Sequence, residues 1–132
     1  MSVLIDTSAW IDYFNPRETA AAASVARALA EDDVVLGDLV LVELLQGIRQ
    51  DRQVGRTLEE LGRLERASLC GPVLAELAAA NYRLLRRKGL TIRGTIDVII
   101  ATWCIANRVA IIHNDRDLAV MERELGLVAY SG

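Results

Sequence analysis

Four acidic side chains are the residues of this sequence whose types and positions best fit catalysis: Asp6, Glu43, Asp97 and Asp115. Carboxylates gathered in one place repel one another and raise one another's pKa values, and a divalent cation removes that repulsion. A purely oxygen ligand set favours Mg²⁺ or Mn²⁺ over zinc, because these hard cations prefer carboxylate and water. We therefore expect a site for one or two such ions, which would support hydrolysis of a phosphodiester bond.

Asp97 is the most informative of these acids because its neighbours are aliphatic. Ile96, Val98 and Ile99 flank it in a segment whose apolar residues run nearly all round a helix, which indicates burial. A carboxylate in such surroundings is costly to desolvate unless a cation or hydrogen-bond donors compensate. Asp97 could instead cap the helix. That alternative explains one acid at a helix start, but not four acids at one edge of a sheet.

The elements that must position these acids alternate between short apolar strands and helices. Strands are expected at residues 3–5, 34–36, 67–70, 108–112 and 127–130, and helices at 8–13, 19–30, 38–48, 56–66, 72–89, 95–107 and 117–125. Ser8 and Asp38 are expected to cap the first and third of these helices. Strands separated by helices indicate parallel βαβ units. We therefore expect one α/β sandwich that spans residues 1–132.

The expected strands place the acids at a common edge. Asp6 directly follows the first strand, Asp115 lies three residues beyond the end of the fourth, and Glu43 is on the helix after the second. In an open parallel sheet, functional residues gather at the carboxyl ends of the strands. We therefore expect these side chains to converge. Asp12 lies away from these strand ends and is expected to be solvated.

Charge is distributed unevenly along the chain. The formal net charge of −3 argues against a nucleic-acid partner. Residues 77–96, however, contain no acid but five basic residues: Arg83, Arg86, Arg87, Lys88 and Arg93. This run is either a solvated helix face, which is the more common case, or a local track for phosphates. Arg93, four residues before Asp97, either reaches a scissile phosphate or is only a charge at the approach to the helix.

Composition indicates a globular protein without a membrane segment. Hydrophobic residues make up 52% of the 132 residues and charged residues 25%. The longest strongly apolar run, residues 98–106, is far shorter than the roughly 20 residues of a membrane-spanning helix. Two cysteines do not make a disulfide framework, and we expect Cys104 to be a small core residue. The expected location is the cytoplasm.

Four segments together resemble a known family. They are VLIDTSAWIDYF, LVLVELLQGIR, IDVIIATWCIANRVAIIHNDRD and the GL near the C-terminus. In this order they resemble a PIN domain, and more specifically the VapC toxins of bacterial toxin–antitoxin pairs. The resemblance spans essentially the whole chain. It implies a PIN-like α/β/α sandwich with a mostly parallel sheet of about five strands flanked by helices.

The resemblance also implies roles for individual residues. Asp6, Glu43, Asp97 and Asp115 match the metal-binding acids of the family, and Asp117 matches the second acid of a D-x-D pair, often an auxiliary ligand or a supporting group. Thr7 and Ser8 fall in the segment that supports the first aspartate through hydroxyl hydrogen bonds. The basic residues named above, Arg86, Arg87, Lys88 and Arg93, become candidates for RNA binding.

The activity implied by the resemblance is an Mg²⁺- or Mn²⁺-dependent endoribonuclease. Its substrate would be structured RNA such as tRNA, and its effect would be to inhibit translation. The family implies a homodimer and neutralisation by a cognate antitoxin. We hypothesise that an amphipathic antitoxin helix fills an apolar groove and places an arginine among the acids.

One residue departs from the family pattern, and other functions deserve comparison. His113 stands where many relatives have Thr or Ser; it could bond a carboxylate, meet RNA phosphate or be tolerated at a strand end, and we do not count it as catalytic. A dehalogenase-like phosphatase needs an acid where Ser8 stands, and a receiver domain needs a late lysine, whereas the only lysine is Lys88 on a helix. The remaining alternative is a PIN-like module that binds RNA or a partner without cutting.

Overall fold

The centre of the molecule is a parallel four-stranded sheet in the order β3-β2-β1-β4. The computed structural model describes residues 1–15 and 17–131. The strands are β1 (Ser2–Ile5), β2 (Asp33–Gly37), β3 (Glu65–Ala67) and β4 (Ala110–Ile112). Val3 and Leu4 of β1 pair with β2 on one side and β4 on the other, and both are fully buried. The α/β sandwich expected from the sequence is therefore confirmed.

The expectation of about five strands is corrected to four. Residues 127–130 contribute only an isolated bridge, between Ala129 and Ile111, in place of a fifth strand. The third strand also lies earlier than the expected 67–70. After Ala67 the chain leaves the sheet, because the Leu69 N–H donates to Asp38 Oδ1 at 3.0 Å. The fully buried side chain of Leu69 lies against Gly37, the last residue of β2.

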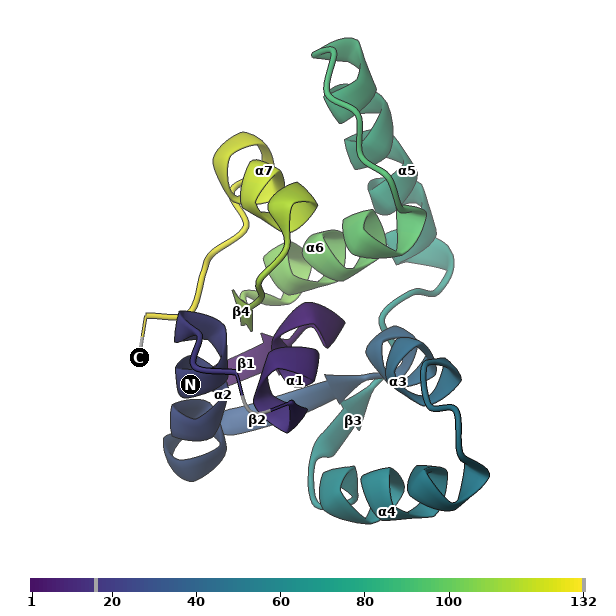
Figure 1. Cartoon of the computed structure of the whole chain (residues 1–132). Helices are drawn as coiled ribbons and strands as arrows, with labels where there is room; N and C mark the ends of the chain where they lie inside the picture. The colour runs from purple at the N-terminus through teal and green to yellow at the C-terminus, as the bar shows by residue number, and fades with distance from the viewer. Residues whose placement is uncertain (16, 132) are drawn as a thin grey trace.

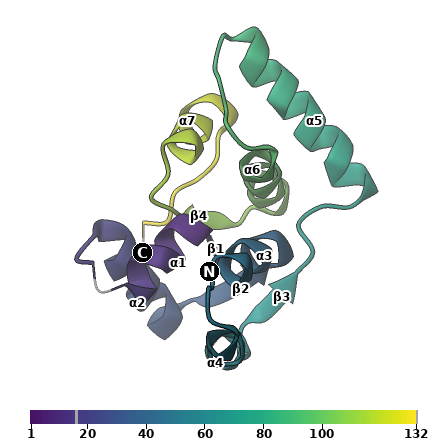
Figure 2. The same cartoon turned by 45° about the vertical axis from the view of Figure 1, so that its right-hand side comes forward.

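Seven helices are present in the described residues, and most of them lie around the sheet (Figure 1). They are α1 (Thr7–Phe14), α2 (Ala20–Glu31), α3 (Asp38–Gln46), α4 (Asp51–Leu61), α5 (Pro72–Arg87), α6 (Thr95–Asn107) and α7 (Arg116–Leu125). Figure 2 shows that α5 stands away from the sheet at the opposite end of the molecule from α4. It packs on α6, which in turn contacts α7 and β4.

Helix boundaries follow local signals where the caps are short polar residues. Residues 95–107 form α6 as expected, and Thr19 caps α2 by accepting a hydrogen bond from the N–H of Ala22 at 3.1 Å. The helix expected at 56–66 instead begins at Asp51, whose charge suits the first turn, and ends before Gly62. The cap of α1 is Asp6 rather than Ser8, and Gly37 precedes α3 where Asp38 was expected to cap it.

Aliphatic side chains form most of the core, in keeping with the low aromatic content. Trp10 is the largest fully buried side chain, and α6 buries Val98, Ile100 and Cys104 beneath the sheet strands. Burial raises the pKa of the Cys104 thiol to about 12, so this residue is a neutral core thiol, as the sequence indicated. Within residues 1–15 and 17–131, no helix combines the length and apolar character needed to cross a bilayer.

Replacing Gly37 with Ala is expected to destabilise the fold, because the added Cβ would lie 2.4 Å from Cδ1 of Leu69. We expect the free energy of unfolding to fall by about 1–3 kcal/mol, the usual cost of overpacking a core. Denaturant unfolding followed by circular dichroism measures it. Gly55→Ala is the matched control: it lies inside α4, nothing lies within 4 Å of its added Cβ, and stability should rise slightly. Equal stability of Gly37→Ala and the parent chain would contradict this packing account.

Candidate metal centre

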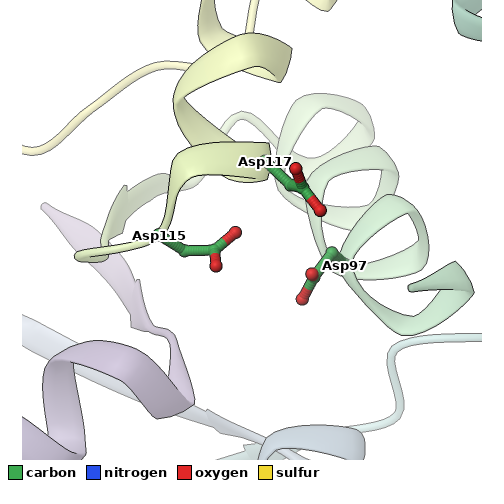
Figure 3. A group of neighbouring side chains, drawn as sticks. All are labelled: Asp97, Asp115 and Asp117. Carbon is green, nitrogen blue, oxygen red and sulfur yellow. The ribbon is translucent and has the colours of Figure 1, made fainter. Parts of the chain in front are cut away.

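Five carboxylates converge where β1 and β4 end. Figure 3 shows Asp97, Asp115 and Asp117 directed toward one space, and one oxygen from each lies within 4.8 Å of the other two. Asp97 comes from the first turn of α6, while the other two flank the start of α7. The charges of Asp6 and Glu43 act on the same group, since both raise the pKa of Asp97. The structure therefore brings Asp97, Asp115 and Asp117 within reach of one ion. It places Asp6 and Glu43, the other two acids predicted from the sequence, close enough to act on Asp97 through their charge.

The two strand-end aspartates are held in the same way. Asp6 is the N-cap of α1, and its Oδ2 accepts hydrogen bonds from the backbone N–H of Ser8 at 3.0 Å and from its hydroxyl at 2.6 Å. Asp115 is the N-cap of α7, and its Oδ2 accepts from the N–H of Leu118 at 3.0 Å. One oxygen of each carboxylate thus completes a helix start. None of these hydrogen bonds uses the second oxygen of its carboxylate.

A buried acceptor at this position lacks a partner. Asp6 is 4% exposed, and its Oδ1 is fully buried without a hydrogen bond. Such an atom costs free energy unless another group satisfies it, and buried polar groups in proteins are nearly always paired. A hard divalent cation would satisfy this oxygen and offset the repulsion among the neighbouring acids. The residues present therefore fit a metal ion of the Mg²⁺ or Mn²⁺ type.

The hydroxyl groups of Thr7 and Ser8 serve different acids. Ser8 supports Asp6, as the family resemblance implied. Thr7 instead donates its hydroxyl hydrogen bond to Oε1 of Glu43 at 2.9 Å, so the expectation that it supports the first aspartate is wrong. As the first residue of α1, Thr7 directs its side chain across to α3 rather than back to Asp6. Each of the two hydroxyls therefore orients a different carboxylate.

Asp97 has the most perturbed acidity of the group. Burial is the main cause and repulsion by Asp6 and Asp115 follows, and together with smaller contributions from other acids they raise its pKa from 3.8 to about 7. Burial also raises the pKa values of Asp6 and Glu43. Gly94 is the N-cap of α6 and makes no side-chain cap, so capping does not explain Asp97. The carboxylate stands at the helix start to face other carboxylates.

Asp117 connects the centre to the loop before α6. It is 6% exposed, and its Oδ2 accepts the backbone N–H of Arg93 at 3.0 Å, with Nε of the same arginine 3.9 Å away. Most of the Arg93 side chain stays exposed. The other basic candidates lie at the C-terminal end of α5. Arg86 and Arg87 are exposed, whereas Lys88 donates a hydrogen bond to Glu124 of α7 at 3.1 Å. Of the basic residues predicted from the sequence, Arg93 is therefore the one seen in contact with an acid of the centre.

Asp12 and Asn114 are residues that sequence reasoning missed. Asp12 is only 3% exposed, so the expectation that it is solvated is wrong. Its Oδ2 accepts from the Thr19 hydroxyl at 3.0 Å and from Nδ2 of Asn114 at 2.8 Å, while the Asn114 N–H donates to Ser8 Oγ at 2.9 Å. The hydrogen bonds of Asn114 to Asp12 and Ser8 hold the segment that carries Asp115 against α1. The three-residue spacing between Ala9, which is buried, and Asp12 was the available signal.

Comparison with known proteins now decides the family. The profile of the PIN domain matches residues 3–124. This chain belongs to the PIN-domain family. Within it, the chain is 35% identical over 132 residues to ribonuclease VapC11 of Mycobacterium tuberculosis and to VapC ribonuclease Mb1587 of Mycobacterium bovis, with 98% of each chain covered. The resemblance to VapC toxins found in the sequence is therefore confirmed.

Solved structures of lower identity show the same fold. VapBC2 from Rickettsia felis, bound to a promoter DNA fragment, aligns with a TM-score of 0.75 at 20% identity, covering 98% of both chains. VapBC-1 from nontypeable Haemophilus influenzae aligns with a TM-score of 0.74 at 18% identity, covering 99% of this PIN domain and 98% of the other chain. The arrangement of strands and helices is therefore that of a PIN fold.

The stability of the metal-free protein should depend on pH in a defined direction. An acid whose folded pKa is raised favours the folded state at low pH, and this contribution is lost as the pH rises through the folded pKa. For Asp97 this stability is lost between about pH 4 and about pH 7. The raised pKa values of Asp6 and Glu43 change the stability in the same direction. With EDTA present, we therefore expect the Tm to fall between pH 5 and pH 8, and Mg²⁺ to restore part of it at pH 8.

Asp97→Asn isolates the contribution of this residue. The variant removes the group that must ionise, so in EDTA its Tm should fall less between the two pH values than that of the parent chain. Asp51→Asn, an exposed change in α4, is the control and should leave the difference unchanged. Parallel Tm profiles for Asp97→Asn and the parent chain would contradict the electrostatic account.

Proposed function

We propose that residues 1–132 form a single PIN domain that hydrolyses phosphodiester bonds in RNA as a divalent-metal-dependent endoribonuclease. The observation that carries this proposal is the convergence of Asp6, Glu43, Asp97 and Asp115, one of which keeps a buried, unpartnered oxygen. The relatives named as ribonucleases, 35% identical to this chain, support the same activity.

Asp6, Asp97 and Asp115 would hold the ion, with Glu43 and Asp117 as further ligands or as bases for its water. When bound, Mg²⁺ or Mn²⁺ lowers the pKa of a water molecule and neutralises charge on the phosphate. Without a cation the pKa of Asp97 is raised to about 7, so near neutral pH its carboxyl group is partly protonated and would lose that proton on becoming a ligand. Ser8 and Thr7 keep the carboxylates of Asp6 and Glu43 oriented.

Basic side chains beside the acids would bind the RNA backbone. Arg93 is exposed and next to Asp117, and Arg86 and Arg87 extend the positive surface along the end of α5. Lys88 is a weaker candidate, because it already pairs with Glu124. We propose a structured RNA such as tRNA as the substrate, with inhibition of translation as the outcome. A neighbour in fold, VapC20 of Mycobacterium tuberculosis, is described as a toxin that cleaves the sarcin–ricin loop.

We propose a cognate antitoxin as the partner of this PIN domain. An open groove between α1, α3 and α4 has apolar lining residues in Ile11, Phe14, Leu44 and Ile48. Polar and charged residues line the rest of it, among them Glu43. Apolar side chains of an antitoxin helix would fill the groove, and an arginine beyond them would reach the acids and compete with metal. Neighbours in fold include VapBC complexes from Rickettsia felis and Salmonella typhimurium, which supports this assignment.

A homodimer is the oligomeric state we propose. The outer helix α5 packs on α6, yet Val73 is 75% exposed and Leu77 is 47% exposed on its surface. The adjoining hollow between α5 and α6 is lined by three alanines, by Tyr82 and Ile99, and by more polar residues that include Arg83. A second copy that covers this surface would remove apolar area from water.

Cleavage of cellular RNA tests the proposed activity. With Mn²⁺ or Mg²⁺ the parent chain should cut RNA, and EDTA should abolish cleavage. Asp97→Asn should lower the rate at least about 100-fold, because losing even an outer partner of a metal ligand costs about 10–100-fold. Asp51→Asn should keep the parent rate, and circular dichroism checks that each variant is folded. Undiminished cleavage in EDTA would contradict metal dependence.

The alternative function, binding without cutting, predicts a different result. A folded parent chain that binds RNA or antitoxin but cleaves no cellular RNA with either metal would favour that alternative. Sequencing the RNA ends that appear on expression then identifies the substrate. Ends within tRNA support the proposed target, and ends in another RNA class contradict it.

A further inference from the structure

The histidine at the end of β4 has a partner on each ring nitrogen. His113 Nδ1 lies 3.1 Å from the backbone nitrogen of Asp115, and Nε2 lies 2.5 Å from Oε2 of Glu122 in α7. The imidazole is only 9% exposed, whereas the Glu122 side chain is 33% exposed. The ring therefore fills a fixed place between the turn after β4 and the second half of α7, and it has no free nitrogen to offer an RNA phosphate.

The chemistry of these contacts fixes which nitrogen carries the proton. A backbone N–H can only donate, so Nδ1 accepts the bond from Asp115 and carries no hydrogen. Nε2 then carries the hydrogen and donates it to the Glu122 carboxylate. Glu122 thus accepts the hydrogen of Nε2 and holds the plane of the ring, in the way that outer carboxylates orient metal-binding histidines. Here the oriented histidine ring in turn accepts a hydrogen bond from the backbone N–H of Asp115.

Three hydrogen bonds hold the turn that carries Asp115. The N–H of Asp115 is bonded to His113, its Oδ2 caps α7 through Leu118, and the preceding N–H of Asn114 is bonded to Ser8. Side chains, and not strand pairing, satisfy both backbone amides of this turn. Loss of the His113 acceptor would leave the Asp115 N–H unbonded and free the peptide to rotate. The carboxylate of Asp115 would then lose its direction toward Asp97.

We propose that His113, oriented by Glu122, is a positioning residue for Asp115, and that it sets the affinity of the acid cluster for a divalent cation. This inference rests on the proposed function, because it takes the cluster as a metal centre. His113 does not touch the acids' shared space and is not a catalytic residue. Its effect on the reaction passes through the Asp115 peptide.

The tautomer is tested first, on the metal-free protein, by nitrogen NMR of the histidine ring at one mildly alkaline pH. His113 is the only histidine, so the spectrum needs no assignment. We expect Nδ1 without hydrogen and Nε2 with hydrogen. In Glu122→Gln we expect a mixture of the two tautomers, with the hydrogen on either nitrogen. A ring that carries its hydrogen on Nδ1 in the parent chain would overturn the proposal.

Two substitutions of His113 test the hydrogen bonds at Nδ1 and at Nε2 separately. In His113→Asn, an amide oxygen occupies the place of Nδ1 and still accepts the Asp115 N–H. In His113→Gln, the longer amide reaches Glu122 but leaves the Asp115 N–H without its acceptor. Titration of Mn²⁺ followed by electron paramagnetic resonance measures the affinity directly. We expect the Mn²⁺ affinity of His113→Gln to fall about 10–100-fold, which is typical when a residue that orients a ligand is lost. The Mn²⁺ affinity of His113→Asn should stay within about threefold of the parent value.

The ranking of the variants decides the outcome. Both variants remove the imidazole, so a merely structural role would weaken Mn²⁺ binding equally in both, and equal losses would overturn the proposal. If His113→Gln does not fold, hydrogen exchange of the Asp115 amide replaces it. Protection in the parent chain and in His113→Asn, with faster exchange in Glu122→Gln, supports the proposal, and an unprotected amide in the parent chain overturns it.

RNA cleavage separates this proposal from the proposed function. In His113→Gln we expect a lower kcat that added Mn²⁺ recovers, with the KM for RNA unchanged, because the ring does not contact RNA. A parent chain that binds Mn²⁺ with the expected ranking of variants but cuts no RNA would contradict the nuclease function alone. A parent chain that cuts RNA, with His113→Gln equal to it in Mn²⁺ affinity, would contradict the positioning role alone.

Discussion

Repulsion among carboxylates is the constraint on which the rest of this structure depends. Asp97 faces Asp6 and Asp115 in a partly buried space, and burial and charge together hold its pKa near 7. A folded chain keeps such a cluster only if other interactions offset the repulsion. Two helix starts contribute, because Asp6 and Asp115 each give one oxygen to a backbone N–H. A divalent ion would complete this compensation.

The sheet brings these groups together through the order of its strands. β1 and β4 are neighbours, and the N–H of Asp6 donates to the carbonyl of Ile112 at 2.9 Å, so the turns that carry Asp6 and Asp115 start side by side. The helix α6 then supplies Asp97 and α3 supplies Glu43. Residues more than 100 positions apart therefore meet because strand pairing is parallel and the helices begin at one edge.

Sequence reasoning predicted the elements whose signals are local. The bounds of α6 and the strand ends before Asp6 and Asp115 follow from apolar periodicity and from short polar residues at helix starts. It overestimated the sheet, because residues 127–130 have strand-like composition but only one bridge to β4. Composition expresses a preference for extended backbone, and the number of paired residues depends on how much of the neighbouring strand is available.

The interactions that escaped prediction are hydrogen bonds across long stretches of chain. Asp12 pairs with Asn114, and Thr7 orients Glu43, but neither partner is indicated by any local pattern. A polar side chain on a helix has the same appearance in the sequence whether it meets solvent or a distant loop. Its partner is decided only when the sheet has placed that loop. The acids could be predicted as a group since a strand end is a position that topology alone defines.

Anomalous diffraction from crystals grown with Mn²⁺ tests the central claim most directly. The account predicts a manganese peak within coordination distance of the free oxygen of Asp6 and of carboxylate oxygens of Asp97 and Asp115. Crystals of Asp97→Asn grown in the same solution should show a weaker peak or none. Manganese bound elsewhere on the surface, with these three carboxylates directed away from one another, would contradict the account.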